Sequence, residues 1–174
     1  RLLDGEGLEP DVSGLPIYWW EADSMPIHEQ TEEIAEFCQK NNVRLVIIDA
    51  AADACGGEPE KAVVALQYFN ALNRIQSLSG ASTLSIAHLT HAAVLNELQK
   101  PQVPFGSRFF RNRARMLWRA DKVDGHSAQA MTVTLTNTKF NDGPRPGPFA
   151  FRIEFDDPEG QVTVQNAPFT GEAL

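Results

Sequence analysis

The stretch Val43-Arg44-Leu45-Val46-Ile47-Ile48-Asp49 decides how the rest of this 174-residue chain is interpreted. Apolar residues fill five of its seven positions and four of them are β-branched, a pattern typical of a short strand buried on both faces, as in parallel sheets. The stretch ends on a carboxylate, Asp49. We therefore expect Asp49 at the carboxyl edge of a parallel sheet, where open α/β folds bind their ligands.

Asp49 has two interpretations at this stage. A carboxylate at a sheet edge can hold the water shell of a Mg²⁺ ion bound to a nucleotide. Alternatively, the residue begins the next loop or caps a helix. The strand pattern itself leaves both interpretations open.

The regions on either side of this strand show helical and strand patterns in alternation. Residues 17–20 predict a peripheral strand, and apolar spacing over residues 29–40 predicts a helix. A second helix is expected over residues 59–76, with Pro59 in its first turn, and residues 83–87 predict a second buried strand that ends at His88. Strand, helix, strand in this order predicts a parallel βαβ unit.

Parallel strands end together, so Asp49 and His88 should lie at the same edge of the sheet. His88 could sense a γ-phosphate or polarise an attacking water, or it could form a hydrogen bond within an ordinary connection. His88 and His91 also have a spacing that metal ligands adopt, but no further His/Cys cluster supports a zinc site.

The last third of the chain shows a period of two. Apolar and polar residues alternate over residues 131–136 and 149–155, and Val162 with Val164 continues the pattern after a turn. This predicts an antiparallel meander. A polar tip that carries Lys139 and Arg145 is expected to connect its first two strands.

The net charge of −8 hides an asymmetry. Residues 1–60 carry a net charge of −11, whereas residues 61–174 carry +3. The second part contains a basic cluster of six cations within fifteen residues, in and just after an expected helix over residues 106–114 and around a short strand over residues 116–118: Arg108, Arg111, Arg113, Arg115, Arg119 and Lys122. The basic cluster could bind DNA phosphates or an acidic surface of a neighbouring subunit, or it could be a solvated basic face.

Composition places the chain among ordinary globular proteins. With 43% hydrophobic residues it is long enough for one well-buried domain, and no run approaches the length of a membrane span. Two cysteines form neither a disulfide framework nor a metal-ligand spacing. A cytoplasmic protein without membrane contact is the expectation.

Five motifs follow one another in a fixed order. They are Leu45 to Asp49, residues 54–60, Ile86-Ala87-His88, residues 104–115 and residues 139–144. In this order they resemble the Walker B strand, the segment after it, the sensor strand, the Gly-Ser helix and the finger loop of RecA-like ATPases. The closer resemblance is to RepA-type hexameric replicative helicases and related phage and plasmid ATPases, and it covers roughly residues 15–164.

The resemblance implies roles for individual residues. In that family ATP and Mg²⁺ bind between subunits, and a neighbour supplies a cation that stabilises the transition state. Asp49 would support Mg²⁺ through water, and His88 would be the sensor. Lys139 and Arg145 would act in trans, and Arg115 would lie near the nucleotide or serve a structural or interface role.

One family motif is missing. No Gly-x-x-x-x-Gly-Lys-Ser/Thr sequence occurs in the chain, although this P-loop supplies the backbone donors and the lysine that hold the phosphates. We therefore expect residues 1–174 to form a single domain, the C-terminal portion of a RecA-like ATPase, with an incomplete RecA fold and no ATP hydrolysis by itself.

The parent activity implied by the resemblance is that of an ATP-dependent DNA helicase or related motor in DNA replication. Self-association into a dimer or a ring is expected, both from the family and because an incomplete sheet leaves edges uncovered. The alternative is a non-catalytic module for oligomerisation or for nucleic-acid binding through the basic cluster.

Overall fold

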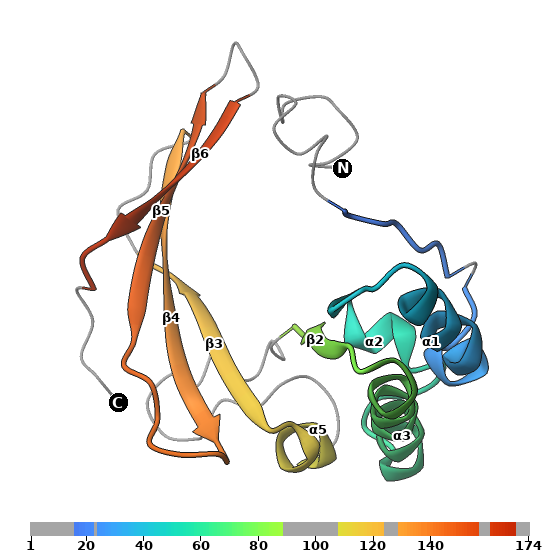
Figure 1. Ribbon diagram of the computed structural model, residues 1–174. Helices are drawn as coiled ribbons and strands as arrows, with labels where there is room; N and C mark the ends of the chain where they lie inside the picture. The colour runs from blue at the N-terminus through green and yellow to red at the C-terminus, as the bar shows by residue number, and fades with distance from the viewer. Residues whose placement is uncertain (1–15, 23, 89–107, 124–128, 157–160, 170–174) are drawn as a thin grey trace. The chain divides into compact units, whose positions relative to one another are not determined.

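The computed structural model describes residues 16–22, 24–88, 108–123, 129–156 and 161–169. Its architecture is mixed α/β and divides into two compact units (Figure 1). The helical unit comprises residues 20–114, and the sheet unit comprises residues 115–174 together with residues 1–19. The expectation that residues 1–174 form one domain stays a prediction.

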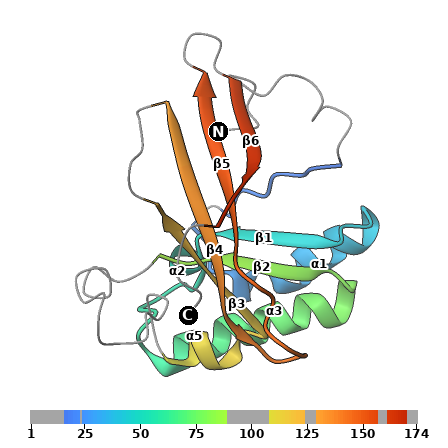
Figure 2. The same cartoon turned by 90° about the vertical axis from the view of Figure 1, so that its left-hand side faces the viewer.

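The helical unit contains a parallel two-stranded sheet and its connecting helices. Its elements are η2 (Ile27–Glu29), α1 (Thr31–Lys40), β1 (Leu45–Asp49), α2 (Ala51–Ala54), α3 (Ala62–Ser79), β2 (Ser82–Ile86) and α5 (Arg108–Arg113). Strands β1 and β2 pair in parallel from Leu45 opposite Ser82 to Asp49 opposite Ile86, and Figure 2 shows them side by side. The predicted βαβ unit is therefore confirmed.

Local sequence explains the boundaries of the two longer helices. Glu32 and Glu33 lie in the first turn of α1 and Lys40 in its last, where their charges complement the helix dipole. Helix α3 ends at Gly80, which adopts a left-handed φ of 75° and donates its N–H to the carbonyl of Gln76 at 2.8 Å. Glycine occupies that conformation without a steric penalty, so it terminates the helix cleanly.

The core of the helical unit lies on one face of the β1–β2 sheet. Helices α1 and α3 pack there with Ile48, and the buried set includes Ile34, Cys38, Ala65, Tyr68, Leu72, Ile75 and Phe110. The expectation that β1 is buried on both faces is wrong. Leu45 and Ile47 remain 49% and 58% exposed, because the helices cover only the face that carries Val46 and Ile48.

The strand predicted over residues 17–20 is also wrong. This segment is irregular and exposed. Trp20 contacts α1 instead: its indole N–H donates to Oε1 of Gln30 at 2.8 Å, and its ring packs edge-on against Phe37 with centroids 5.5 Å apart. Trp20 therefore contributes an aromatic contact and a hydrogen bond to α1 and is not part of a strand ladder.

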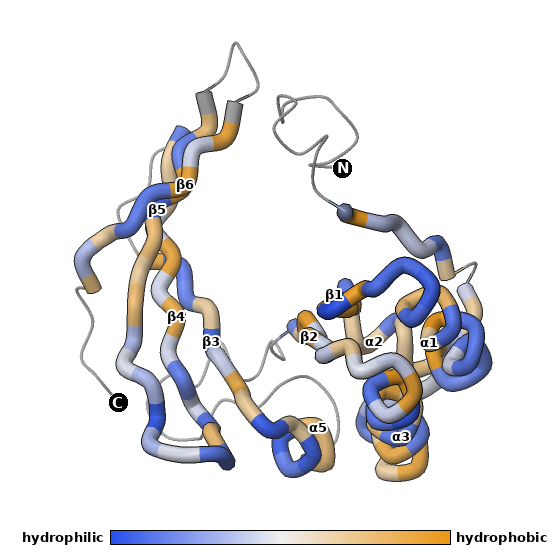
Figure 3. Tube along the Cα trace, in the orientation of Figure 1, coloured by the Kyte–Doolittle hydropathy of each residue, from blue (hydrophilic) through white to orange (hydrophobic). Residues whose placement is uncertain are grey.

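The sheet unit is a four-stranded antiparallel meander, as predicted. Its strands are β3 (Met116–Lys122), β4 (Ala130–Phe140), β5 (Phe149–Asp156) and β6 (Gln161–Ala167), in the order β3-β4-β5-β6. Strand β3 extends four residues beyond the predicted end at residue 118. The alternation of hydrophobic and hydrophilic residues along β4 and β5 can be followed in Figure 3.

The strand register gives this meander two chemically different faces. Met131, Ile153 and Val164 align across three strands, and together with Val133, Leu135, Phe149, Phe151, Phe155 and Val162 they form an apolar face. Thr132, Arg152 and Gln165 align on the opposite, polar face. On the apolar face Trp118 packs edge-on against Phe149 at 5.4 Å between ring centroids.

Candidate functional site

Asp49 and the residues after β2 lie at the same edge of the parallel sheet. Asp49 is the last residue of β1 and pairs with Ile86, the last residue of β2, and His88 follows two residues later. Both Asp49 and His88 are exposed. The peptide bond from Asp49 to Ala50 is cis, and the short helix α2 begins at Ala51. The predicted juxtaposition of the two strand ends is thus present in the structure.

A partly buried hydrogen bond links β2 to α3 beneath this edge. The hydroxyls of Tyr68 and Ser85 lie 2.7 Å apart, and Ser85 is the register partner of Ile48. Tyr68 is completely buried, and its ring stacks on Phe110 with centroids 5.6 Å apart. Burial raises the pKa of Tyr68 to about 12. The phenol therefore stays neutral and hydrogen-bonded at physiological pH.

The segment after Asp49 is held by a buried cysteine and a close glycine contact. Cys55 is fully buried, and burial raises its pKa to about 11, so the thiol is protonated and unreactive. Gly56 adopts a φ of 70°, and a Cβ built on it would lie 2.2 Å from Cβ of Pro26. The chain before α1 thus packs directly against the chain that follows the Asp49 edge.

A metal site at this edge would rest on Asp49. The described residues contain no group of three or more His, Cys, Asp or Glu side chains arranged for a metal ion. A single exposed carboxylate suits Mg²⁺ that keeps most of its waters and binds through a nucleotide, and it does not suit zinc. The possible zinc partner His91 lies outside the described residues.

The candidate cations of the sheet unit differ from expectation. Lys139 does not lie on the polar tip: it is part of β4 and pairs with Leu117 of β3. Its placement follows from a register shift between Leu117 and Trp118, which lets the β3–β4 ladder continue to Phe140. Arg145 lies on the connection between β4 and β5 and is exposed.

Arg115 supports the same connection from its base. Its guanidinium is hydrogen-bonded to the carboxylate of Asp142, and its carbonyl accepts the N–H of Asn141 at 3.1 Å. These contacts describe a structural role for Arg115, which is one of the roles that the resemblance implies for this residue. A role of Arg115 at the nucleotide stays a prediction.

The basic cluster is divided between the two units. Arg108, Arg111 and Arg113 belong to α5 of the helical unit, whereas Arg115, Arg119 and Lys122 belong to the sheet unit. Two of its members are ion-paired within the sheet unit: Arg115 with Asp142, and Arg119 with Asp121 at 2.5 Å. These carboxylates reduce the positive charge that the cluster can offer to phosphates.

The candidate site residues therefore form two groups. Asp49 and His88 belong to the helical unit, and Lys139, Arg145 and Arg115 belong to the sheet unit. The structure brings Asp49 and His88 to one sheet edge and Arg115 to the base of the loop that carries Arg145.

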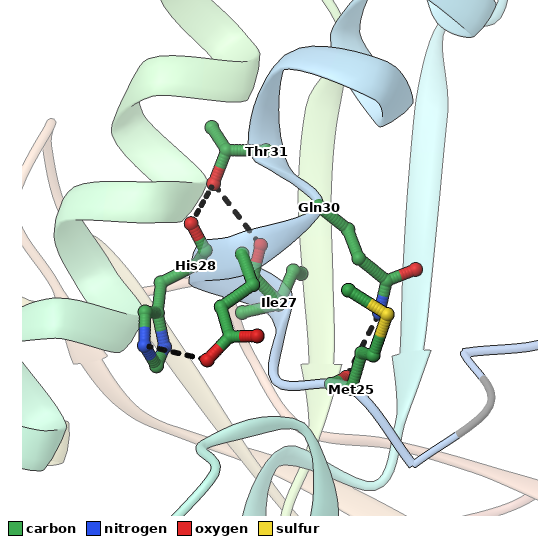
Figure 4. Close-up of polar contacts among 6 residues, drawn as sticks. Met25, Ile27, His28, Gln30 and Thr31 are labelled. Atoms are coloured by element: carbon green, nitrogen blue, oxygen red, sulfur yellow. Dashed lines mark hydrogen bonds and ion pairs between the residues drawn. The ribbon is translucent and has the colours of Figure 1, made fainter.

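A polar node before α1, centred on Gln30, was not predicted from the sequence. The Gln30 side chain is buried, and its amide donates to the carbonyls of Met25 at 2.8 Å and Ala22 at 3.2 Å. Beside it Thr31 donates to the carbonyls of Ile27 and His28, and Nε2 of His28 lies 3.9 Å from Glu29 (Figure 4). A glutamine just before a helix was the only sequence signal.

A second missed feature is Asn137 of β4. It is 6% exposed, and neither polar atom of its side chain has a hydrogen-bond partner among the described residues. Asn137 pairs with Trp118 directly beside the register shift. An amide in an otherwise apolar alternation, after Met131, Val133 and Leu135, is a signal that the periodicity could have revealed.

None of the helices in the described residues combines the length and the apolar character that crossing a membrane requires. No protein-family model matches the chain, and no curated protein matches it. The resemblance to RecA-like ATPases therefore rests on the sequence motifs alone.

Proposed function

We propose that this chain supplies the metal-side carboxylate, the sensor residue and the trans-acting cations of a RecA-like ATPase of the RepA helicase type. The observation that carries the proposal is the parallel pairing of β1 and β2. It ends with Asp49 opposite Ile86 and leads within two residues to His88. A nucleotide at such an edge would meet both side chains.

Asp49 has the properties that this role requires. It is exposed, and no described residue bonds to its carboxylate, so the group is available to water molecules of a hydrated cation. Mg²⁺ dehydrates reluctantly and is usually held by one or two carboxylates together with substrate phosphates. The carboxylate would orient the metal, and the metal would neutralise charge on the phosphates.

The phosphates need donors that this chain does not contain. Without a P-loop sequence, the exposed Asp49 edge offers ATP a carboxylate and an imidazole but no cradle of backbone N–H groups. We propose that a P-loop segment outside these 174 residues completes the site. The chain by itself should accordingly show no measurable affinity for Mg-ATP.

The sheet unit would act on a neighbouring subunit's nucleotide. Arg145 is exposed on the β4–β5 connection, and Arg115 with Asp142 braces the base of that connection. A cation delivered in trans stabilises the charge that develops on the transferred phosphoryl group. Lys139, one residue before the end of β4, is the second candidate.

The test is ATP hydrolysis by this chain joined to a P-loop segment of the same ATPase type, with Asp49→Ala compared against Asp53→Ala. Asp53 is an exposed carboxylate on α2, four residues away, and controls for the loss of one negative charge. Loss of the metal-orienting group should lower the rate about 100-fold or more. Asp53→Ala should retain the activity of the unsubstituted protein.

Two results would overturn the proposal. The first is equal activity of the two variants. The second is calorimetric binding of Mg-ATP to the chain alone that Asp49→Ala abolishes, because a phosphate site would then exist without a P-loop. Circular dichroism of both variants verifies that they fold.

Self-association without nucleotide chemistry is a second candidate function. It is favoured by the apolar outer face of the β1–β2 sheet, where Leu45, Ile47, Leu84 and Ile86 are each more than 40% exposed. Nucleic-acid binding through the basic cluster gains no comparable support, since two of the six cations are ion-paired.

A further inference from the structure

Strand β6 is an edge strand of the meander. The strand order β3-β4-β5-β6 places it last, and it pairs only with β5, from Ala150 opposite Ala167 to Asp156 opposite Gln161. In the described part of the chain no backbone group bonds to its other side. Thr163 and Gln165 are exposed, and Val164 is 62% exposed. An unpaired row of N–H and C=O groups is a template for another strand.

The two edges of this sheet are protected to different degrees. Strand β3 carries Arg119, Asp121 and Lys122 and is interrupted by the register shift at Leu117, features that discourage edge pairing. Strand β6, Gln161 to Ala167, contains no charge, no proline and no register shift. Uncharged segments of this length with β-branched residues have a high tendency to pair.

The sequence of β6 is also self-complementary. Gln161-Val162-Thr163-Val164-Gln165 reads identically in both directions, with Thr163 at its centre. In an antiparallel pair of two such strands centred on Thr163, Val162 would lie opposite Val164 of the other copy, and Thr163 would lie opposite Thr163. We propose that β6 pairs antiparallel with β6 of a second copy of this chain, about a two-fold axis at Thr163.

This register keeps the two faces of the sheet consistent. Val162 and Val164 align with Phe155 and Ile153 on the apolar face, so a second β6 continues the apolar face across the axis. Thr163 aligns with Glu154 on the polar face, and the two threonines at the axis face each other there. Valine pairs and threonine pairs directly opposite each other are favourable cross-strand contacts.

The inference is independent of the proposed ATPase role, because it uses no residue of the Asp49 edge or the basic cluster. A single strand pair is a small contact area, so the dimer should be weak and dependent on concentration. Isologous pairing closes after two copies and does not generate a fibre through the same edge.

The first test places like charges on the axis. In Thr163→Lys, the lysine lies beside Glu154 within one copy but opposite another lysine in the dimer. Sedimentation equilibrium should show a dissociation constant about tenfold or more higher than that of the unsubstituted chain. Thr163→Glu should do the same, and an equimolar mixture of the two variants should restore dimers through opposite charges.

Asn141→Lys is the matched control, since this exposed residue of the β4–β5 connection receives the same charge away from β6. It should associate like the unsubstituted chain. Circular dichroism verifies that Thr163→Glu folds despite the second carboxylate beside Glu154.

A cysteine probe tests the register directly. The natural cysteines, Cys38 and Cys55, are both buried, so Thr163→Cys introduces one exposed thiol, as does Asn141→Cys. Opposed residues of an antiparallel pair have Cα atoms close enough for a disulfide. Mild oxidation should crosslink Thr163→Cys at least about fivefold faster than Asn141→Cys, at a concentration where the unsubstituted chain is dimeric.

Three outcomes would overturn the proposal. The chain could be monomeric at about 100 μM, a concentration at which even weak strand pairs associate. Thr163→Lys could associate as strongly as Asn141→Lys. Alternatively, the two cysteine variants could crosslink at the same rate, which would place any association elsewhere on the surface.

Discussion

Among the described glycines, Gly56 is the one at which an added methyl group should disturb the structure most. It combines a φ of 70° with a close approach to Pro26, where an added Cβ would lie 2.2 Å from one ring carbon and 2.6 Å from another. Gly56→Ala should lower the free energy of unfolding by about 2 kcal/mol or more. Urea denaturation followed by circular dichroism measures the change.

Gly80→Ala separates the two contributions to that loss. Gly80 has nearly the same φ, 75°, but an added Cβ would meet no heavy atom within 4 Å. Only the left-handed conformation is penalised there, at about 1 kcal/mol. Equal losses for the two variants would show that Pro26 moves away without cost.

Tyr68 should make stability depend on alkaline pH. Burial raises its pKa to about 12, whereas a tyrosine in the unfolded chain titrates near its ordinary value of about 10. Below pH 10 Tyr68 is protonated in both states, and its full contribution to stability is present. Between about pH 10 and 12 only the unfolded state releases the proton, so stability falls, by about 3 kcal/mol in total.

Tyr68→Phe should flatten this part of the pH profile, although it costs about 1 kcal/mol at neutral pH because Ser85 loses its partner. Tyr18→Phe is the control, because Tyr18 is the other tyrosine of the chain and is 47% exposed. Buried Cys55, with its pKa raised to about 11, adds a loss of the same sign at slightly lower pH in all three proteins. A profile that is unchanged in Tyr68→Phe would assign the alkaline loss to other groups.

At the scale of elements, periodicity identified most of the structure. Helices α1 and α3, strands β1 and β2 and the meander were all predicted, because a repeating apolar face is a property of the sequence itself. Periodicity did not predict which face of β1 the helices cover. The run from Leu45 to Ile48 is apolar at every position, so only the placement of α1 and α3 shows which residues are covered.

The failures have local physical causes. Residues 17–20 have strand-like composition but pair with no strand among the described residues, and Trp20 contacts Gln30 and Phe37 instead. Lys139 was placed on the polar tip that follows the alternating residues 131–136, yet the shifted β3–β4 register carries β4 to Phe140. Tertiary pairing therefore decided both cases, and sequence propensity did not.

Part of the candidate site was predictable from the sequence, and part was not. That Asp49 and His88 share an edge follows from strand order, which the sequence reveals. The Arg115–Asp142 pair and the Gln30 node depend on which loops meet, which the sequence does not reveal. The pattern of residues in one sequence does not predict side-chain contacts between segments that are distant along the chain.

At the scale of the whole molecule, the net charge of −8 sets the response to salt. Raising the ionic strength from about 0.01 M to about 0.1 M shortens the Debye length from about 30 Å to about 10 Å and screens repulsion between like charges. The apparent Tm should rise by about 2 °C, and the dimer should tighten, since two acidic copies approach through uncharged strands. Scanning calorimetry and sedimentation at the two salt concentrations measure these changes. A fall in Tm would show that surface ion pairs outweigh the net repulsion.

The Tyr68–Ser85 hydrogen bond has a consequence for how the parallel sheet is aligned. A shift of β2 by one residue along β1 would turn Ser85 outward and bring Leu84 or Ile86 against the phenol, which would then be buried without an acceptor. Ser85 is a weaker strand former than valine or isoleucine, but those residues could not distinguish the correct alignment from its neighbours. Ser85 thus lowers the strand propensity of β2 but favours one alignment of β2 over its neighbours. That alignment places Asp49 opposite Ile86, the last residue of β2.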